Sequence, residues 1–232
     1  MKLNKTIILT LSITLSIFGY ISCSFPEKTN FVNDKEKHVT GLVGLKVKCP
    51  EKQLIQGFHL IRNGENQIGY EYKCFTPAPN SNLKKSTKSI SNPWTDIGTT
   101  DKATNYLDRQ TVECPANMGL NSFNLEINNS KTKMRYVYFC TELSVRTCSQ
   151  KSTQLTDSSS NFQNIYLDRQ TVTTERADQF LQKFRLATIG QNFKYDYTYC
   201  DQLIKPKPEK AQVLILDPEL AANKRNSDNQ II

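Results

Sequence analysis

The polar residues that recur at a fixed spacing in this chain are an aspartate, an arginine and a glutamine in a row. An arginine guanidinium binds carboxylate, sulfate or phosphate through parallel hydrogen bonds, and the neighbouring carboxylate and amide can hydrogen-bond sugar hydroxyls. The pattern therefore predicts a repeated, lectin-like ligand site. Its residues are Asp108, Arg109, Gln110, Asp168, Arg169 and Gln170.

A structural role for the same residues is the alternative. In that interpretation the aspartate caps a turn, and the arginine braces a neighbouring repeat through an ion pair. We expect the segment around them to be a strand, in which adjacent side chains point to opposite faces and cannot line one pocket. The sequence therefore favours the bracing role over the ligand role.

The remaining reactive side chains form no readable catalytic pattern. The histidines are His38 and His59, and His59 lies on the polar phase of an expected strand, where it would be solvated. The sequence contains no Gly-x-Ser-x-Gly motif, no Cys-His arrangement and no paired acids at a readable spacing. We expect no enzymatic activity, no cofactor and no metal ion.

An internal repeat organises the chain. Residues 106–112 recur letter for letter as residues 166–172, and each copy continues with a Phe-x-Leu motif and then a Tyr-x-Tyr motif that ends at a cysteine. An earlier, degenerate copy keeps these two motifs but lacks the Tyr-Leu-Asp-Arg-Gln segment. The three copies span approximately residues 41–75, 94–141 and 155–201.

Within each copy the apolar residues alternate with polar ones, which is the period of a strand. In the second copy Phe123 and Leu125 precede the turn-like residues 128–131, and Tyr136 and Tyr138 follow them. This pattern predicts a β-hairpin with one buried face, and the other two copies show the same pattern.

Three such hairpins cannot each bury a face alone and must pack against one another. The expected fold class is all-β, with three antiparallel repeats of about sixty residues in a pseudo-threefold β-prism or barrel-like arrangement; a β-sandwich is the alternative. Trp94 and the tyrosines are expected in the core. Loops are expected at residues 75–93 and 149–161, a short helical turn within residues 175–184, and an edge strand at residues 211–216.

The sequence has seven cysteines, of which Cys23 falls in the N-terminal export signal, and the six that remain in an exported chain indicate a disulfide framework. The cysteine before Phe-x-Leu and the one after Tyr-x-Tyr recur together in the first two copies, which pairs them within each copy. In the third copy Thr174 replaces the first of these cysteines, so the two remaining cysteines are left for each other. The expected bridges are Cys49–Cys74, Cys114–Cys140 and Cys148–Cys200.

Export is indicated by the N-terminus, where a short basic stretch precedes an uncharged apolar run. Residues 1–23 are therefore expected to be a signal peptide, residues 24–204 a single disulfide-stapled three-repeat domain, and residues 205–232 a loosely ordered basic tail. The expected location is secreted and extracellular, without a transmembrane span. The alternative is a lipid anchor at the cell surface through Cys23.

The net charge of +8 and the isoelectric point near 9.1 favour anionic partners such as acidic glycans. No nucleic-acid recognition motif accompanies the charge, so we expect no nucleic-acid partner. Asn128 opens an Asn-Asn-Ser sequence in a predicted hairpin turn, which predicts N-glycosylation there.

The order of motifs invites a comparison with known families. Trp94, the Cys-Pro pair at Cys114, the Phe-x-Leu at Phe123 and the closing Cys140 follow one another in repeats after a signal peptide. This order resembles vitelline membrane outer layer proteins, and the Asp-Arg pair is more remotely similar to dermatopontin-type matrix proteins. The resemblance implies an extracellular coat or matrix protein, a β-prism in the first case, and contact with carbohydrate.

Three functional hypotheses follow. The first is a secreted structural or adhesive component of an extracellular coat or matrix, whose partners are other coat proteins or further copies of this chain. The second is a glycan-binding, lectin-like protein that uses the Asp-Arg-Gln residues. The third is a secreted hydrolase or inhibitor whose site is scattered along the chain.

Overall fold

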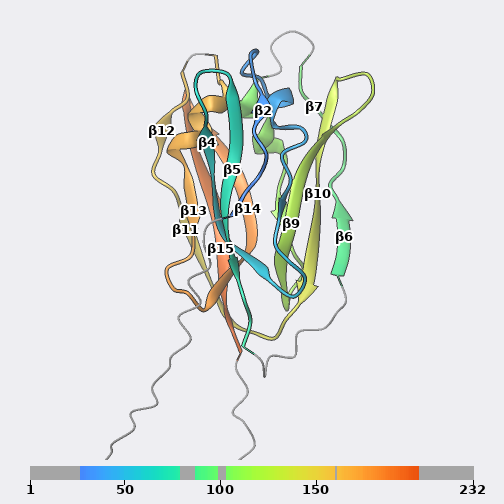
Figure 1. The fold of residues 1–232 in the computed structure, drawn as a ribbon, viewed down its shortest axis with the longest axis vertical. Helices are drawn as coiled ribbons and strands as arrows, with labels where there is room; N and C mark the ends of the chain where they lie inside the picture. The colour runs from blue at the N-terminus through green and yellow to red at the C-terminus, as the bar shows by residue number, and fades with distance from the viewer. Residues whose placement is uncertain (1–26, 79–86, 99–102, 160, 204–232) are drawn as a thin grey trace, which may run out of the picture.

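A computed structural model describes residues 27–78, 87–98, 103–159 and 161–203, which form three five-stranded antiparallel sheets. The sheets run along the long axis of the molecule around a common centre (Figure 1). The expected all-β class with three antiparallel units is confirmed. No helix within these ranges is long and apolar enough to cross a membrane.

Several expectations fall on other parts of the chain. The signal peptide at residues 1–23, the basic tail at 205–232 and the edge strand at 211–216 all lie outside the described residues. The two ends of the expected domain, residues 24–26 and 204, also lie outside them.

Each sheet is built on the hairpin of one repeat, as the alternating pattern predicts. We name the sheets A, B and C in chain order. The hairpins are β4 (Leu54–Arg62) with β5 (Gln67–Phe75) in sheet A, β9 (Met118–Ile127) with β10 (Lys133–Glu142) in sheet B, and β14 (Gln179–Ile189) with β15 (Asn192–Gln202) in sheet C.

Two outer strands pair with the second strand of every hairpin. They are β1 (Glu27–Lys28) and β2 (Val32–Asn33) on β5, β6 (Thr87–Ser91) and β7 (Thr95–Asp96) on β10, and β11 (Val145–Ser152) and β12 (Thr156–Asp157) on β15. The expectation of loops at residues 75–93 and 149–161 is therefore wrong, because β6 and parts of β11 and β12 lie there. These segments are polar because they form exposed edge strands. Amino-acid composition alone does not distinguish an exposed edge strand from a loop.

A short strand of each repeat crosses to the next sheet and closes the prism. The pairs are β3 (Val47–Lys48) with β9, β8 (Val112–Glu113) with β14, and β13 (Thr171–Thr173) with β4. The first repeat thus donates to the second, the second to the third, and the third to the first. This cyclic exchange makes the three repeats one folding unit.

The segment before each donated strand is a 3-10 helix and not the expected strand. The helices are η1 (Val39–Leu42), η2 (Thr104–Arg109) and η3 (Asn164–Arg169). The chain must reverse here before it crosses to the next sheet, and the buried Leu107 and Leu167 anchor the turn. The helical turn expected within residues 175–184 is also wrong, since β14 begins at Gln179.

The core is organised around three phenylalanines, one from each hairpin. The ring centroids of Phe58, Phe123 and Phe184 lie 4.8–4.9 Å apart, with interplanar angles of 61–62° for all three pairs. Edge-to-face packing of this kind is the favoured geometry for aromatic rings. The triangle marks the pseudo-threefold axis of the molecule.

Three buried tyrosines surround this triangle in the same cyclic order. Tyr70 packs against Phe58 of its own hairpin and Phe123 of the next. Tyr136 and Tyr195 repeat the arrangement around the axis. The expectation that the tyrosines lie in the core is confirmed for these three residues and for Tyr72, Tyr138, Tyr197 and Tyr199, whereas Tyr106 and Tyr166 are only partly buried.

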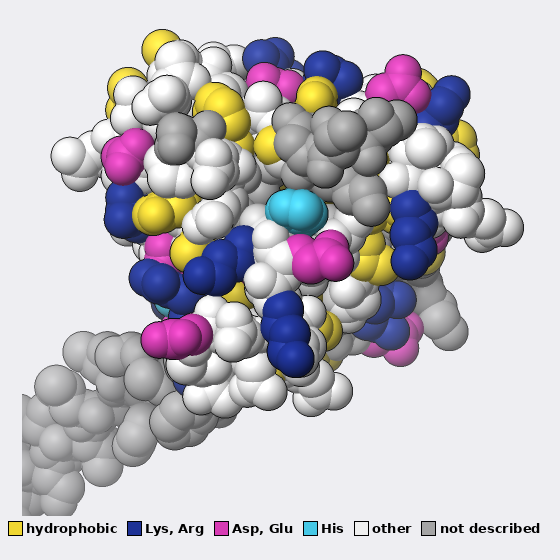
Figure 2. All heavy atoms as spheres, turned by 90° about the horizontal axis from the view of Figure 1, so that it is seen from above, with side chains coloured by type: hydrophobic (Ala, Val, Ile, Leu, Met, Phe, Trp, Pro, Cys, Tyr) yellow, Lys and Arg dark blue, Asp and Glu magenta, His cyan; other side chains and the backbone are white. Residues whose placement is uncertain are grey.

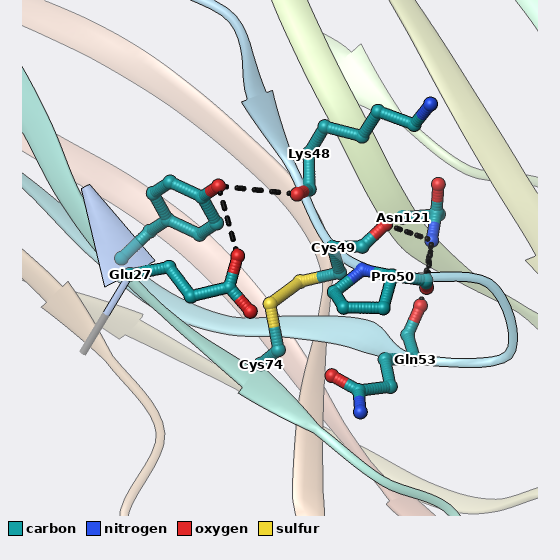
Figure 3. The surroundings of a disulfide bond; sticks show 8 residues. Glu27, Lys48, Cys49, Pro50, Gln53, Cys74 and Asn121 are labelled. Carbon is teal, nitrogen blue, oxygen red and sulfur yellow. Dashed lines mark hydrogen bonds between the residues drawn. A yellow bond between two sulfur atoms is a disulfide. The ribbon is translucent and has the colours of Figure 1, made fainter. Parts of the chain in front are cut away.

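The three expected disulfides are present, and two of them join neighbouring sheets. Cys49 directly follows β3, which belongs to sheet B, and is bonded to Cys74 of sheet A (Figure 3). Cys114 and Cys140 join sheets C and B in the same way. The third bridge, Cys148–Cys200, joins two paired strands within sheet C. The seam between sheets C and A therefore has no disulfide among the described residues.

Each hairpin also carries a β-bulge with an amide side chain. The bulged residues are Gln56, Asn121 and Gln182, which the ladder registers skip. Asn121 donates to the carbonyl oxygen of Gln53 over 2.7 Å, and so holds the loop after the strand donated by the previous repeat (Figure 3). Gln56 and Gln182 make the corresponding bonds at the other two seams.

We predict alkaline destabilisation from the buried tyrosines. Burial raises the pKa of Tyr70, Tyr136 and Tyr195 well above the ordinary value, and for the last two a neighbouring buried phenol adds to the shift. Below pH 10 the three phenols are protonated in both the folded and the unfolded protein. Above pH 10 only the unfolded chain releases these protons, so the free energy of unfolding falls as the pH rises. The loss approaches about 4 kcal/mol per pH unit for the three groups together.

Urea unfolding between pH 8 and 11.5 measures this loss. The variant with all three tyrosines changed to phenylalanine is expected to show a correspondingly flatter decline. Ionisation of these phenols near pH 10 in the folded protein, seen as full absorbance change at 295 nm, would contradict the prediction.

The seam without a disulfide provides a second prediction. Thr174 occupies the position of Cys49 and Cys114, and Tyr199 that of Cys74 and Cys140. Changing Thr174→Cys together with Tyr199→Cys should therefore form a fourth bridge, which stabilises the fold by about 3 kcal/mol. The comparison is with Thr174→Ser plus Tyr199→Ser, which cannot cross-link. Peptide mapping that finds the two new thiols free would show that the seams are not equivalent.

Candidate functional site

The glutamines of the repeated Asp-Arg-Gln motif are buried braces. Gln110 donates from Nε2 to the Pro93 carbonyl over 3.2 Å and to Thr95 Oγ1 over 2.6 Å. Gln170 donates to the Phe193 carbonyl over 3.0 Å and also bonds to Thr156. Both residues thereby tie a 3-10 helix to an outer strand of the same repeat, which satisfies the amide inside the protein.

The arginines of the motif are held against the surface by an aromatic ring. The Arg109 guanidinium lies 4.3 Å above the Tyr106 ring, and its Nη1 donates to the Asp96 carbonyl over 2.9 Å. Arg169 lies 4.5 Å above Tyr166 and makes the corresponding 2.9 Å bond to Asp157. A cation–π contact and a hydrogen bond therefore fix each guanidinium.

The aspartates of the motif are both half-buried. Asp168 is paired with Arg62 of β4, which joins the third repeat to the first. Asp108 is half-buried at the same position of η2, which packs against β14. The motif residues are thus distributed among different contacts and do not line one pocket. These contacts match the bracing role, and a ligand role for the motif stays a prediction.

The end of the prism that carries these helices has a mixed charge. Figure 2 looks onto this end and shows basic and acidic side chains interspersed, with a histidine near the middle. Neighbouring charges of opposite sign reduce the potential that an anionic ligand would meet.

The first repeat differs from the other two around a buried carboxylate, that of Asp34. Gly41 stands where the other repeats have Tyr106 and Tyr166, and an added Cβ there would lie 2.0 Å from Asp34 Oδ1. Burial raises the pKa of Asp34, and the adjacent Asn164 amide opposes that shift. Only glycine leaves room for this carboxylate.

A groove crosses the outer face of sheet B. It has a volume of about 790 Å³ and extends from Trp94 to Val43 and Gly44. Its floor and walls include the side chains of Asn124, Glu126, Asn128 and Lys133. The groove therefore combines one aromatic ring with amides and charges of both signs, as small-molecule sites do.

Trp94 is an ordered, exposed platform and not the core residue that the sequence suggested. The indole is 38% exposed, and the Arg135 guanidinium lies 4.4 Å from its ring centroid. Glu126 accepts two hydrogen bonds from Arg135, over 3.0 Å from Nε and 2.8 Å from Nη2. This chain of contacts fixes the indole in place. The core expectation failed because an aromatic residue next to a strand can face either side of a sheet.

The hairpin turn at one end of the groove is held by Asn128. Its Oδ1 accepts from the backbone N–H groups of Thr132 and Lys133 over 2.9 Å each, and its Nδ2 donates to Ser130 Oγ over 2.7 Å. The predicted turn at residues 128–131 is therefore present, and its first residue lines the groove.

The pseudo-symmetry places apolar residues at the equivalent positions of the other sheets. Phe31, Trp94 and Leu155 each stand just before a short outer strand, and all three are exposed. Phe31 packs against Gly69, and within the described ranges no cation lies over its ring as Arg135 lies over Trp94. Only sheet B thus presents an indole stacked on a guanidinium.

The outer face of sheet A carries the other notable polar contact. His59 Nε2 lies 3.2 Å from Glu71, which also faces Lys28 over 3.5 Å. His59 is partly exposed in a row of polar contacts across the strands. In the part of the chain that the structure describes, no three His, Cys, Asp or Glu side chains come close enough to hold a metal ion.

Comparison of the chain with protein-family models, curated proteins and solved structures finds no match. The resemblance to vitelline membrane outer layer and dermatopontin-type proteins accordingly stays a prediction.

Sequence reasoning missed two sets of residues. Every repeat has an amide residue two positions before its phenylalanine, and these residues are Gln56, Asn121 and Gln182. An alignment of the three copies therefore shows an amide at the position of the bulge. The groove residues had no such signal, because Trp94 and Asn124 are brought together only by strand pairing.

We predict a stability role for the motif arginines. Arg109→Ala and Arg169→Ala should each lower the free energy of unfolding by about 1 kcal/mol, since each loses a cation–π contact and a hydrogen bond. Chemical denaturation measures this loss, with Arg146→Ala in the exposed strand β11 as the matched control. Equal stability of the motif variants and the control would exclude the bracing role.

Proposed function

We propose that this protein is an exported glycan-binding component of an extracellular coat or matrix, and that a saccharide lies in the Trp94 groove. The observation that supports the proposal most directly is the exposed indole fixed on Arg135 beside several amide and carboxylate groups. The glycan-bearing partners would be other coat or matrix molecules.

The aromatic platform suits the apolar face of a sugar ring. Stacking on an indole removes water from both surfaces, and a ring that is already fixed loses little conformational entropy on binding. Arg135 and Glu126 supply that rigidity without entering the proposed stacking face.

The polar groups of the groove suit sugar hydroxyls. Asn124 offers both donors and an acceptor, Glu126 offers acceptors, and Lys133 offers donors at the rim. Such groups give orientation and specificity, whereas the aromatic ring gives contact area.

The disulfides and the charge support an extracellular setting. Three bridges in one small domain are compatible with an oxidising compartment. Without Lys2 and Lys5 of the expected signal peptide the net charge of +8 becomes +6, which would attract the exported protein to acidic glycans over distances of a Debye length.

We expect Trp94→Ala to abolish most of the binding. A glycan array first identifies a saccharide, and calorimetry then measures its affinity for the purified protein. Loss of the stacking ring should weaken binding by about 2 kcal/mol, or roughly thirtyfold.

Leu155→Ala is the matched control, because it removes an equally exposed apolar side chain at the pseudo-equivalent position of sheet C. Binding should be unchanged in this variant. The proposal is wrong if no glycan binds to wild-type protein made without N-glycosylation, or if the two variants bind equally.

A further inference from the structure

We infer that an N-linked glycan on Asn128 folds into the Trp94 groove and closes it to free saccharides. The inference rests on the proposed function, because it assumes that a sugar can lie against Trp94. It adds a means by which the protein itself controls that site.

The acceptor sequence forms part of the groove wall. Asn128, Asn129 and Ser130 all line the groove that Trp94 also lines. Asn129 and Ser130 are exposed at the tip of the hairpin, where an attached oligosaccharide meets no protein layer. A glycan at this position therefore starts within the groove and need not cross the surface to reach it.

The hydrogen bonds of Asn128 are compatible with the modification. In the transfer, a new bond forms between Nδ2 and C1 of the first sugar, and the bond between C1 and the pyrophosphate of a lipid-linked oligosaccharide donor breaks. The pyrophosphate leaves with the electron pair, and Nδ2 loses one proton. One N–H remains for Ser130 Oγ, the longer 3.4 Å bond from Nδ2 to Thr132 Oγ1 is lost, and Oδ1 keeps both backbone donors.

The covalent link favours the attached sugar over a free one. A ligand tethered by a short flexible connection experiences an effective concentration of the order of mM. The groove volume of about 790 Å³ lies within the range of sites that enclose small ligands, ~300–1,000 Å³. The attached glycan therefore occupies the groove unless a free saccharide binds far more tightly.

The turn itself provides a matched variant. Lys131 N–H donates to the Asn128 carbonyl over 2.9 Å, which makes Asn129 the second residue of a β-turn. Proline is favoured at that position of a turn, and proline in the middle of the acceptor sequence prevents glycosylation. Asn129→Pro thus removes the acceptor and leaves Asn128 and Ser130 in place, whereas Ser130→Thr keeps the acceptor.

The experiment uses the full chain secreted from a glycosylating eukaryotic host. Intact mass gives glycan occupancy, and Trp94 is the single tryptophan of the sequence, so its fluorescence reports the groove directly. We expect the wild type and Ser130→Thr to carry a glycan, with Trp94 shielded from acrylamide. Asn129→Pro should show an accessible Trp94 and bind an array-identified glycan at least about tenfold more tightly than the wild type.

Two results would overturn the inference: a glycan on Asn128 that leaves acrylamide quenching unchanged, or no glycan in either acceptor-bearing form while a co-expressed reporter is glycosylated. The proposed function fails separately. In that case Asn129→Pro binds no saccharide, although the attached glycan of the wild type still shields Trp94.

Discussion

The packing of Phe58, Phe123 and Phe184 about one axis is the contact on which the rest of the structure depends. Each ring belongs to a different sheet, so no hairpin can bury its apolar face without the other two. Removal of one buried phenylalanine side chain generally costs about 3–5 kcal/mol, which is a large share of the stability of a domain. The three repeats are therefore parts of one cooperative unit. The exchanged strands β3, β8 and β13 join the repeats in a closed ring.

The three seams between the sheets share one set of hydrogen bonds but differ in covalent support. At every seam a tyrosine hydroxyl of the hairpin donates to the carbonyl that ends the donated strand, as Tyr197 does to Thr173 over 3.0 Å. Two seams add a disulfide, whereas the seam that joins the last repeat to the first adds the Arg62–Asp168 ion pair. The ring thus closes through core packing and polar contacts.

A symmetric interior leaves the outer faces free to differ. The inward positions of the hairpins must fit the shared aromatic core, but the outward positions meet solvent and carry no such requirement. Position 94 and its equivalents hold tryptophan, phenylalanine and leucine, and only the tryptophan lies on a guanidinium. One face can therefore acquire a ligand groove while the other two keep only a structural role.

The sequence by itself determined the repeats, the hairpins, the inward alternation and the three disulfides, because these follow from local periodicity and from comparison of the copies. Tertiary structure decided the rest. The Tyr-Leu-Asp-Arg segment is a 3-10 helix because the chain must turn there to reach the next sheet. The alternation of polar and apolar residues in this segment does not show that the chain turns. The groove likewise joins Val43 to Trp94 and Asn124, residues from two repeats, and only the cyclic exchange of strands brings them onto one face.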